Sequence, residues 1–284
     1  MSASPPPAFA VPFRLDQPLP DLAAWTAAFR DAEIPVLHET ADALEGLRAN
    51  EEMVDANSIG EMIAGDPLMT LKVLTHAAKR RPSRVITDAE TVTSALVMMG
   101  IPPFFAAFGP QTSVEEQLGG IPEALAGLDA TLRRAHRGAN FALAIAVHRM
   151  DPDAPVIHAA ALLHDFAEML MWCHAPELAL QIRDAQRADP AHRSGPAQQA
   201  VLNIELVDLQ QALMKAWRLP DLLARISDDR HADHATVRNV VLALRLARHT
   251  AHGWESPAIP DDIAGIAALL NRSPAATLEM MQAV

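Results

Sequence analysis

Apolar residues recur with the three- to four-residue spacing of an amphipathic helix almost everywhere from about Asp21 onward. The alternating pattern of a half-buried β-strand does not persist for more than a few residues. Half of the 284 residues are hydrophobic and one fifth are charged, so helices of this kind can bury a substantial core. The sequence therefore predicts an all-α protein.

Capping signals predict where several helices begin. Asp66-Pro67 and Ser273-Pro274 each place an N-cap acceptor before a proline at the first helical position. Residues 87–90 and 113–116 fit the capping-box pattern, in which a hydroxyl and a later carboxylate each bind a free backbone N–H group. Helices are expected to begin near residues 67, 88, 114 and 274. The apolar spacing indicates further helices over residues 57–64, 121–150, 155–172, 175–188, 196–216, 220–228 and 234–252.

Proline and glycine indicate how the chain is divided. Residues 1–20 carry six prolines and are predicted to form a disordered, proline-rich tail. The segment Gly109–Ile121 contains two consecutive glycines and is the best internal joint. We expect it to divide an N-terminal helical lobe, residues 21–120, from a C-terminal helical bundle, residues 121–284. No repeat of fixed period supports a solenoid.

The charge balance narrows the class of partner. Lys and Arg total 23 against 35 Asp and Glu, which gives a formal net charge of −12. A surface of this sign repels phosphate backbones, so nucleic acid is not expected as a partner. The chain has one cysteine and no signal peptide pattern, and His, Asp, Arg or Pro interrupts its longest apolar stretches before the roughly 20 residues that cross a bilayer. These features predict a cytoplasmic protein that is not inserted in a membrane.

The strongest local signal for chemistry is the pair His164-Asp165, which interrupts the apolar run Ala160–Leu170. Burying both groups is costly unless each finds a partner or a metal. Neighbouring residues on a helix project about 100° apart, but a ring nitrogen and a carboxylate oxygen can still converge on one ion. Iron, manganese or zinc would suit such a site. The alternative is that the two groups bond to each other or to the end of a neighbouring helix.

Elements that extend from about Ile34 to His231 occur in a specific order. They are Ile34–Leu37, Ile63–Leu74, Val85–Asp88 with Ala95–Gly100, Ala161–Asp165 and Trp217–Pro220. In this series the chain resembles the HDOD family, which is related to the HD superfamily of metal-dependent phosphohydrolases. The resemblance implies an HD-like helical bundle with an additional N-terminal helical lobe.

The resemblance also implies where a metal would be held. An active HD phosphohydrolase uses an upstream histidine, the His-Asp pair and a distal aspartate, and the metal activates a water molecule. In this sequence His136 stands at the upstream position, so His136, His164 and Asp165 would be the metal ligands. Iron, manganese or zinc would be the cofactor if this site is functional.

Two other positions of the family pattern are occupied by leucines. Leu244 stands where the distal aspartate is expected, and Leu206 stands where the family has an intermediate histidine. A leucine cannot bind a hard cation, so the metal site is expected to be incomplete and no cofactor is predicted. Asp208 or Glu205 could in principle replace a lost ligand.

Basic residues near His136 suggest a second kind of site. Arg133, Arg134 and Arg137 could hold an anionic phosphate or nucleotide. His231 follows Trp217–Pro220 at the distance where the family often has a histidine pair. Arg133, Arg137 and His231 are therefore candidates for a ligand or partner pocket. The alternative for the arginines is the ordinary charged face of an amphipathic helix.

Three functions are compatible with these features. The resemblance favours a non-catalytic regulatory module of a bacterial signalling pathway, which binds a small ligand or a protein partner in trans. A protein that makes or degrades cyclic dinucleotides is one candidate partner. The alternative is a metal-dependent phosphohydrolase, and the third reading is a helical scaffold in which the His-Asp pair only ties helices together. Metal content separates the first two functions, and a partner separates the first from the third.

Overall fold

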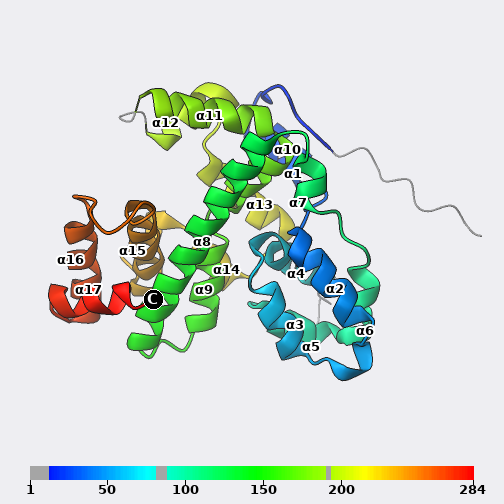
Figure 1. Ribbon diagram of the computed structural model, residues 1–284, viewed down its shortest axis with the longest axis horizontal. Helices are drawn as coiled ribbons and strands as arrows, with labels where there is room; N and C mark the ends of the chain where they lie inside the picture. Colours follow the sequence, from blue (N-terminus) through cyan, green and yellow to red (C-terminus); the bar gives the residue numbers. More distant parts are fainter. Residues whose placement is uncertain (1–12, 81–87, 190–192) are drawn as a thin grey trace, which may run out of the picture.

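A computed structural model describes residues 13–80, 88–189 and 193–284 as a set of packed helices (Figure 1). The helices are α1 (Leu22–Arg30), α2 (His38–Arg48), α3 (Ala56–Ile63), α4 (Pro67–Arg80), α5 (Val92–Met99), α6 (Ile101–Ala107), α7 (Val114–Leu118), α8 (Pro122–His148), α9 (Ala154–Leu162), α10 (Phe166–His174), α11 (Pro176–Ala188), α12 (Ser194–Leu202), α13 (Leu206–Trp217), α14 (Asp221–Ile226), α15 (Ala235–His249), α16 (Ile259–Leu270) and α17 (Pro274–Gln282), with 3-10 turns η1 (Glu51–Met53) and η2 (Asp229–His231). Within the described ranges the only β pairing is an isolated bridge between Val36 and Ser113. The predicted all-α class is confirmed.

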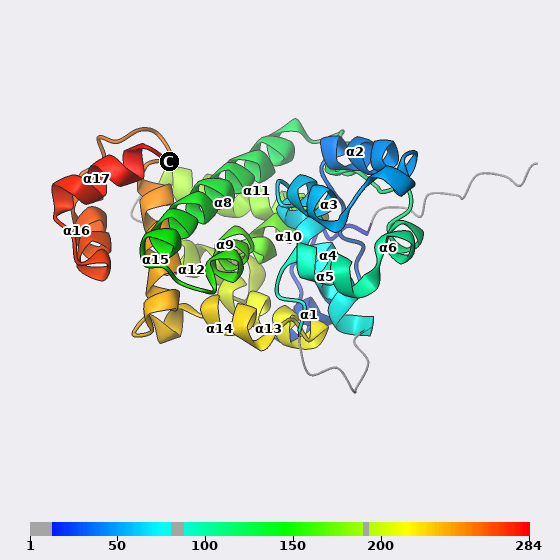
Figure 2. The same cartoon turned by 90° about the horizontal axis from the view of Figure 1, so that it is seen from below.

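The 27-residue helix α8 forms the centre of the molecule. In two perpendicular views, α2–α6 lie on one side of it and α15–α17 lie on the other (Figures 1 and 2). The two most extensive helix pairings among the described elements are those of α8 with α15 and of α8 with α9. The orientation of α8 about its own axis therefore decides which side chains face the rest of the bundle.

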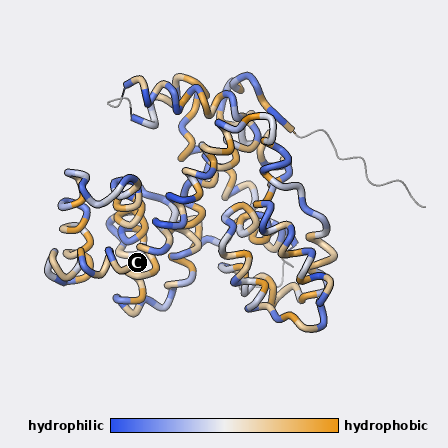
Figure 3. Tube along the Cα trace, viewed as in Figure 1, coloured by the Kyte–Doolittle hydropathy of each residue, from blue (hydrophilic) through white to orange (hydrophobic). Residues whose placement is uncertain are grey.

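Helix α4 joins two hydrophobic cores. Leu68, Leu71 and Leu74 belong to the larger core, which extends from α1 to α17. Met69 and Val73 belong to a smaller core built from residues 36–108. Spacings of three and four residues place each set on its own face of the helix. Figure 3 shows the corresponding mixture of hydrophobic and hydrophilic stretches along the helices.

Three of the four predicted helix starts are confirmed. Helices α4, α7 and α17 begin at residues 67, 114 and 274. Ser113 and Ser273 cap the last two by accepting from a backbone N–H group three residues later. The start near residue 88 is wrong, because Thr91 and Ser94 form the capping box and α5 begins at Val92. Thr87 lies outside the described residues.

The predicted helix over residues 196–216 is divided into α12 and α13. Asn203 lies at the end of α12 with a φ of 65°, in the left-handed region. Asparagine tolerates this conformation better than most residues, and it ends a helix there. The chain then starts α13 at Leu206.

Part of the predicted tail is attached to the helical body. Residues 1–12 lie outside the described residues, whereas residues 13–20 run without helix along α10 and α11. The Leu15 N–H group donates to the carbonyl of His174 at 2.7 Å. Arg14 forms an ion pair with Glu177, and the Phe13 ring lies 5.7 Å from the His174 ring between centroids.

One apolar stretch in the described ranges is long enough to cross a bilayer. It covers residues 154–174, and 83% of its most apolar window is buried inside the protein. The stretch is divided into α9 and α10, and both helices contribute to the larger core. Core helices of this kind have the same length and composition as membrane spans, so the stretch is explained by packing.

Asp66 supplies a prediction about stability. Its fully buried carboxylate accepts from the N–H groups of Leu68 and Met69 at 2.8 and 3.1 Å, and from that of Leu37 at 2.8 Å. Asp66→Asn replaces one oxygen by an amide that cannot accept, so one buried N–H group loses its partner. We expect the free energy of unfolding in urea to fall by about 1–2 kcal/mol. Asp55→Asn at the exposed cap of α3 is the control, with a change within about 0.5 kcal/mol. Equal losses in the two variants would contradict this account of Asp66.

Candidate functional site

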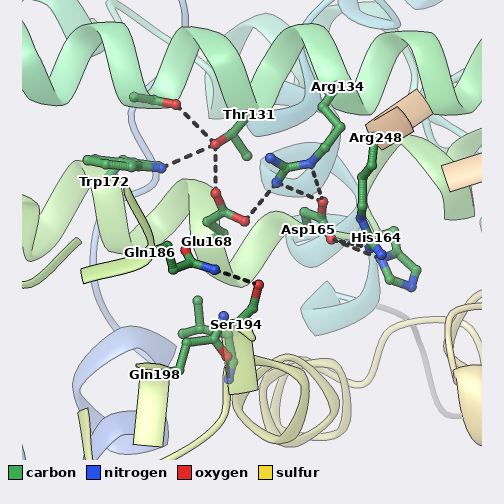
Figure 4. A network of polar contacts seen from close by, with 12 residues as sticks. Thr131, Arg134, His164, Asp165, Glu168, Trp172, Gln186, Ser194, Gln198 and Arg248 are labelled. Atoms are coloured by element: carbon green, nitrogen blue, oxygen red, sulfur yellow. Dashed lines mark hydrogen bonds and ion pairs between the residues drawn. The ribbon is translucent and has the colours of Figure 1, made fainter. Parts of the chain in front are cut away.

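The candidate site begins at a turn between α9 and α10. The sequence predicts one continuous helix over residues 155–172, but α9 ends at Leu162 and α10 begins at Phe166. His164 and Asp165 lie in this turn and their side chains contact each other (Figure 4). Asp165 occupies the N-cap position of α10, yet its side chain makes no capping hydrogen bond. Its carboxylate is instead engaged by other side chains.

Arg134 of α8 binds two carboxylates of α10 and the preceding turn. Its Nε donates to Asp165 Oδ2 at 3.0 Å, and its Nη2 donates to Glu168 Oε2 at 2.7 Å. The arginine side chain is only 22% exposed. Burial opposes the charge of Arg134, but Glu168 and Asp165 outweigh this effect and raise the pKa of the guanidinium. Arg134 is therefore a permanent cation at the centre of the site.

The contacts continue from Glu168 along the same face of α10. Thr131 Oγ1 lies 2.9 Å from Glu168 Oε1 and 3.0 Å from the carbonyl of Gly127, either of which can accept its hydrogen. The indole N–H of Trp172 donates to Thr131 Oγ1 at 3.2 Å. A Cβ atom on Gly127 would lie only 2.5 Å from the Trp172 ring, so glycine permits the close approach of α8 and α10.

His164 lies between two carboxylates. Its Nδ1 is 3.0 Å from Asp165 Oδ1, and its Nε2 is 2.9 Å from Asp229 Oδ1 in η2. An ionised carboxylate only accepts hydrogen bonds, so both ring nitrogens must donate and the ring is an imidazolium. Burial disfavours this charge, but the hydrogen bonds and charges of Asp165 and Asp229 prevail and raise the pKa of His164 to about 9.

Asp165 is held as an anion by the surrounding cations. Burial favours its protonated form, but Arg134, His164 and Arg248 outweigh burial and lower the pKa of Asp165 well below its usual value. Arg248 of α15 reaches within 4.0 Å of Oδ1. The ion-pair network consists of Arg134, His164, Asp165, Glu168 and Asp229. It connects α8, α10, η2 and the turn between α9 and α10.

The structure does not bring His136 to the His-Asp pair. Within the described residues, no group of three or more His, Cys, Asp or Glu side chains could hold a metal ion. His136 is two positions after Arg134 on α8 and therefore projects about 200° away from it. Burial lowers the pKa of His136 and of His158. The predicted ligand set of His136, His164 and Asp165 is not assembled, because Arg134 and not His136 faces the pair.

The residues of the ion-pair network do not fit a divalent metal. An imidazolium has no free lone pair for a metal, and both nitrogens of His164 already donate. Two guanidinium groups, of Arg134 and Arg248, lie against the carboxylate of Asp165. Their positive charge opposes a second cation at the same oxygens. No chemical step through a metal is therefore derived for this site.

The two leucines at family ligand positions are part of the larger core. Leu206 and Leu244 are buried, with 7% and 2% of their surfaces exposed. A Cβ atom on Gly138 of α8 would lie 2.6 Å from Leu244 Cδ2, so Leu244 packs directly against the glycine. Both side chains therefore contribute to apolar packing.

The three residues of the predicted pocket have separate partners. Arg133 is exposed and forms an ion pair with Asp129 one turn earlier on α8. Arg137 donates to the carbonyl of Thr250 at the end of α15. His231 is exposed in η2, with its Nδ1 3.2 Å from Asp228. These contacts do not join the three residues in one pocket.

Sequence reasoning missed the roles of Arg134, Glu168 and Asp229. The spacing could have revealed the first two, since Thr131 and Arg134 are three residues apart on α8, as are Asp165 and Glu168 near the start of α10. Matching spacings of polar residues on two packed helices indicate facing contacts. Asp229 had no such signal because it lies in a 3-10 turn.

Comparison with models of known protein families identifies the family of this chain. A model of the HDOD domain matches residues 34–232. The chain belongs to the HDOD domain family. The matched range includes every residue of the ion-pair network and confirms the resemblance predicted from the ordered elements. Helices α15–α17 of this HDOD protein lie beyond the matched range.

Solved structures with the same fold are distant in sequence. The MmoQ response regulator from Methylococcus capsulatus str. Bath has a TM-score of 0.63 and 18% identity, and the alignment covers 88% of this chain and 98% of MmoQ. A virulence factor from Campylobacter jejuni subsp. jejuni has a TM-score of 0.57 and 17% identity, with 92% and 97% covered. At these identities the similarity shows the fold alone. Curated proteins gave no match.

Proposed function

We propose that this HDOD protein is a non-hydrolysing regulatory module of a bacterial signalling pathway, which acts by binding a protein partner in trans. The observation that carries the proposal is the position of His164 between two carboxylates. Its ring nitrogens lie 3.0 and 2.9 Å from Asp165 and Asp229, so the residue that a hydrolase of the HD superfamily would use as a metal ligand is an internal cation in this proposal. The pair stabilises the bundle and leaves no group free to activate water.

The family gives the general direction of this proposal. HDOD membership supports a role in signalling, and MmoQ, which has a similar fold, is named a response regulator. The candidate partner is a protein that makes or degrades cyclic dinucleotides, as the family resemblance implies. An acidic surface with a net charge of −12 favours a partner with a basic docking face.

Metal content and hydrolysis test the non-hydrolysing part. The full chain, purified without chelator, is analysed for iron, manganese and zinc beside the variant His164→Ala, Asp165→Ala. Both proteins are then assayed with bis(p-nitrophenyl) phosphate in the presence of each metal. We expect less than about a tenth of an equivalent of metal and no hydrolysis above the variant. Stoichiometric metal and hydrolysis that both disappear in the variant would establish the phosphohydrolase instead.

The partner is tested in the bacterium that encodes the chain. Deletion of the gene is expected to change the cellular content of cyclic dinucleotides. His164→Gln, which keeps a hydrogen-bonding side chain, is expected to restore that content, since the pair is structural in this proposal. An unchanged content after deletion would exclude this class of partner. Failure of folded His164→Gln to restore it would contradict a non-catalytic role.

A further inference from the structure

We propose that a cavity between α8 and the C-terminal helices binds a nucleoside monophosphate. The cavity has a volume of about 310 Å³, within the usual range for small-molecule sites. It is lined by Arg137, Asn140, Phe141, Trp254, Met281, Gln282 and Val284. The chain's C-terminal end lies beside α8, near this cavity (Figures 1 and 2). This site is separate from the ion-pair network and goes beyond the proposed regulatory function.

Arg137 supplies a cation for the phosphate. Arg133 and Arg134, earlier on the same helix, are both paired with carboxylates. Arg137 has no carboxylate partner within the described residues, and its one bond goes to the carbonyl of Thr250. The carbonyl is neutral and occupies one of five N–H donors, so the guanidinium keeps donors for an anionic oxygen. Arginine is well suited to phosphate because its donors form a planar fork.

Two aromatic rings supply a wall for a base. The rings of Phe141 and Trp254 lie 6.1 Å apart between centroids at 69°, so Phe141 supports the indole edge-on. Phe141 is buried, whereas Trp254 is half-buried and lines the cavity. Gly253 precedes it with a φ of 120°, a conformation that few other residues adopt. A partly exposed indole is a suitable stacking surface for a nucleobase.

Two amide side chains supply hydrogen bonds for the edge of a base. Asn140 and Gln282 line the same cavity and are exposed, and no hydrogen bond joins either side chain to another residue in the described part of the chain. Amides offer a donor and an acceptor side by side, which is the pattern that recognises nucleobase edges. The combination of a guanidinium, an aromatic wall and free amides fits a planar base joined to one phosphate.

The cavity is formed by two parts of the chain. Arg137, Asn140 and Phe141 belong to the range matched by the HDOD domain, whereas Trp254 and Gln282 lie beyond residue 232. A ligand held between them would bind the C-terminal helices to α8. Occupation of the cavity would therefore stabilise α15–α17 on the HDOD body.

Calorimetric titration of the full chain tests the site. AMP, GMP, CMP and UMP are titrated separately, together with inorganic phosphate and guanosine. We expect saturable binding of at least one nucleotide, at least tenfold tighter than phosphate or guanosine alone. Arg137→Gln is expected to weaken that binding tenfold or more, because a charge-assisted hydrogen bond is lost. Arg133→Gln, one helical turn away and exposed, is the matched control and should stay within twofold.

A second variant separates binding from folding. Arg137 also bonds to Thr250, so Trp254→Leu, which leaves that bond in place, is titrated as well. We expect at least a tenfold loss, as is typical when a stacked base loses its aromatic partner. The absence of saturable nucleotide binding up to about 1 mM would overturn the proposal, as would unchanged affinity in both variants. Phosphate binding as tight as nucleotide binding would show an anion site only. None of these outcomes alters the metal and hydrolysis results, which test the proposed function.

Discussion

Arg134→Met is expected to lower the free energy of unfolding by about 3 kcal/mol or more, because it removes the cation that Asp165 and Glu168 share. Asp165 and Glu168 have side chains that are only 14% and 33% exposed. Methionine preserves most of the length of the side chain and its packing. The fall in the free energy of unfolding therefore measures the contribution of the charge and the hydrogen bonds of Arg134. Urea unfolding at neutral pH gives the value.

Two comparisons make this result specific. Arg133→Met changes the adjacent arginine, which is 67% exposed and paired on its own helix. We expect that variant to stay within about 0.5 kcal/mol of the wild type. Adding Glu168→Gln to Arg134→Met removes the carboxylate that has lost its ion-pair partner, and is expected to recover about 1 kcal/mol. If Arg134→Met were as mild as Arg133→Met, the ion-pair network would not be the structural element described here.

The second large effect is a loss of stability at alkaline pH that depends on His164. The pKa of His164 is about 9 in the folded protein and about 6.5 in the unfolded chain. The folded state therefore holds the proton more tightly. The resulting stabilisation is complete below about pH 6.5 and is lost as the pH rises through about 9. Its size is up to about 3 kcal/mol, and solvent around Asp229, which is 45% exposed, reduces it.

Unfolding in urea at about pH 6 and about pH 10 measures this effect. The wild type is expected to lose up to about 3 kcal/mol more than His164→Gln, which does not titrate in this range. His231→Gln serves as the control, because His231 is exposed and pairs with Asp228 alone among the described residues. The pH dependence of the stability of this variant should therefore follow that of the wild type. Parallel pH dependence of the wild type and His164→Gln would show that His164 is not held as an imidazolium.

On the acid side, Asp165 gives the opposite dependence. The guanidinium of Arg134 and the His164 ring hold its pKa well below the usual value. Its contribution to stability is therefore present above about pH 3.8 and is lost as the pH falls below that value. The network as a whole is therefore most stabilising between about pH 3.8 and about pH 6.5.

Local signals predicted the fold class and several of the helix starts. The all-α class follows from periodicity, and the starts of α4, α7 and α17 follow from side chains that bind backbone groups only a few residues away. The turn at Leu163, His164 and Asp165 contains neither glycine nor proline, so the sequence gives no sign of a break. The break depends on ion pairs with α8 and η2, which are tertiary contacts that override local preference.

The candidate site was harder to predict because it depends on the rotation of α8. Both His136 and Arg134 lie on this helix, and only one of them can face the His-Asp pair. The rotation is set by close packing at two glycines, where Trp172 approaches Gly127 and Leu244 approaches Gly138. The resemblance identified the correct family and the correct pair. It could not show that Arg134 lies beside Asp165.

The most direct test of the account is the protonation state of the His164 ring. Correlation of ring protons with ring nitrogens by NMR, with His164→Gln for assignment, measures both nitrogens at neutral pH. The account predicts two protonated nitrogens whose chemical shifts do not change when zinc or manganese is added. A deprotonated ring nitrogen would contradict it. A metal-dependent change that disappears in Asp165→Asn would also contradict it and would identify the pair as metal ligands.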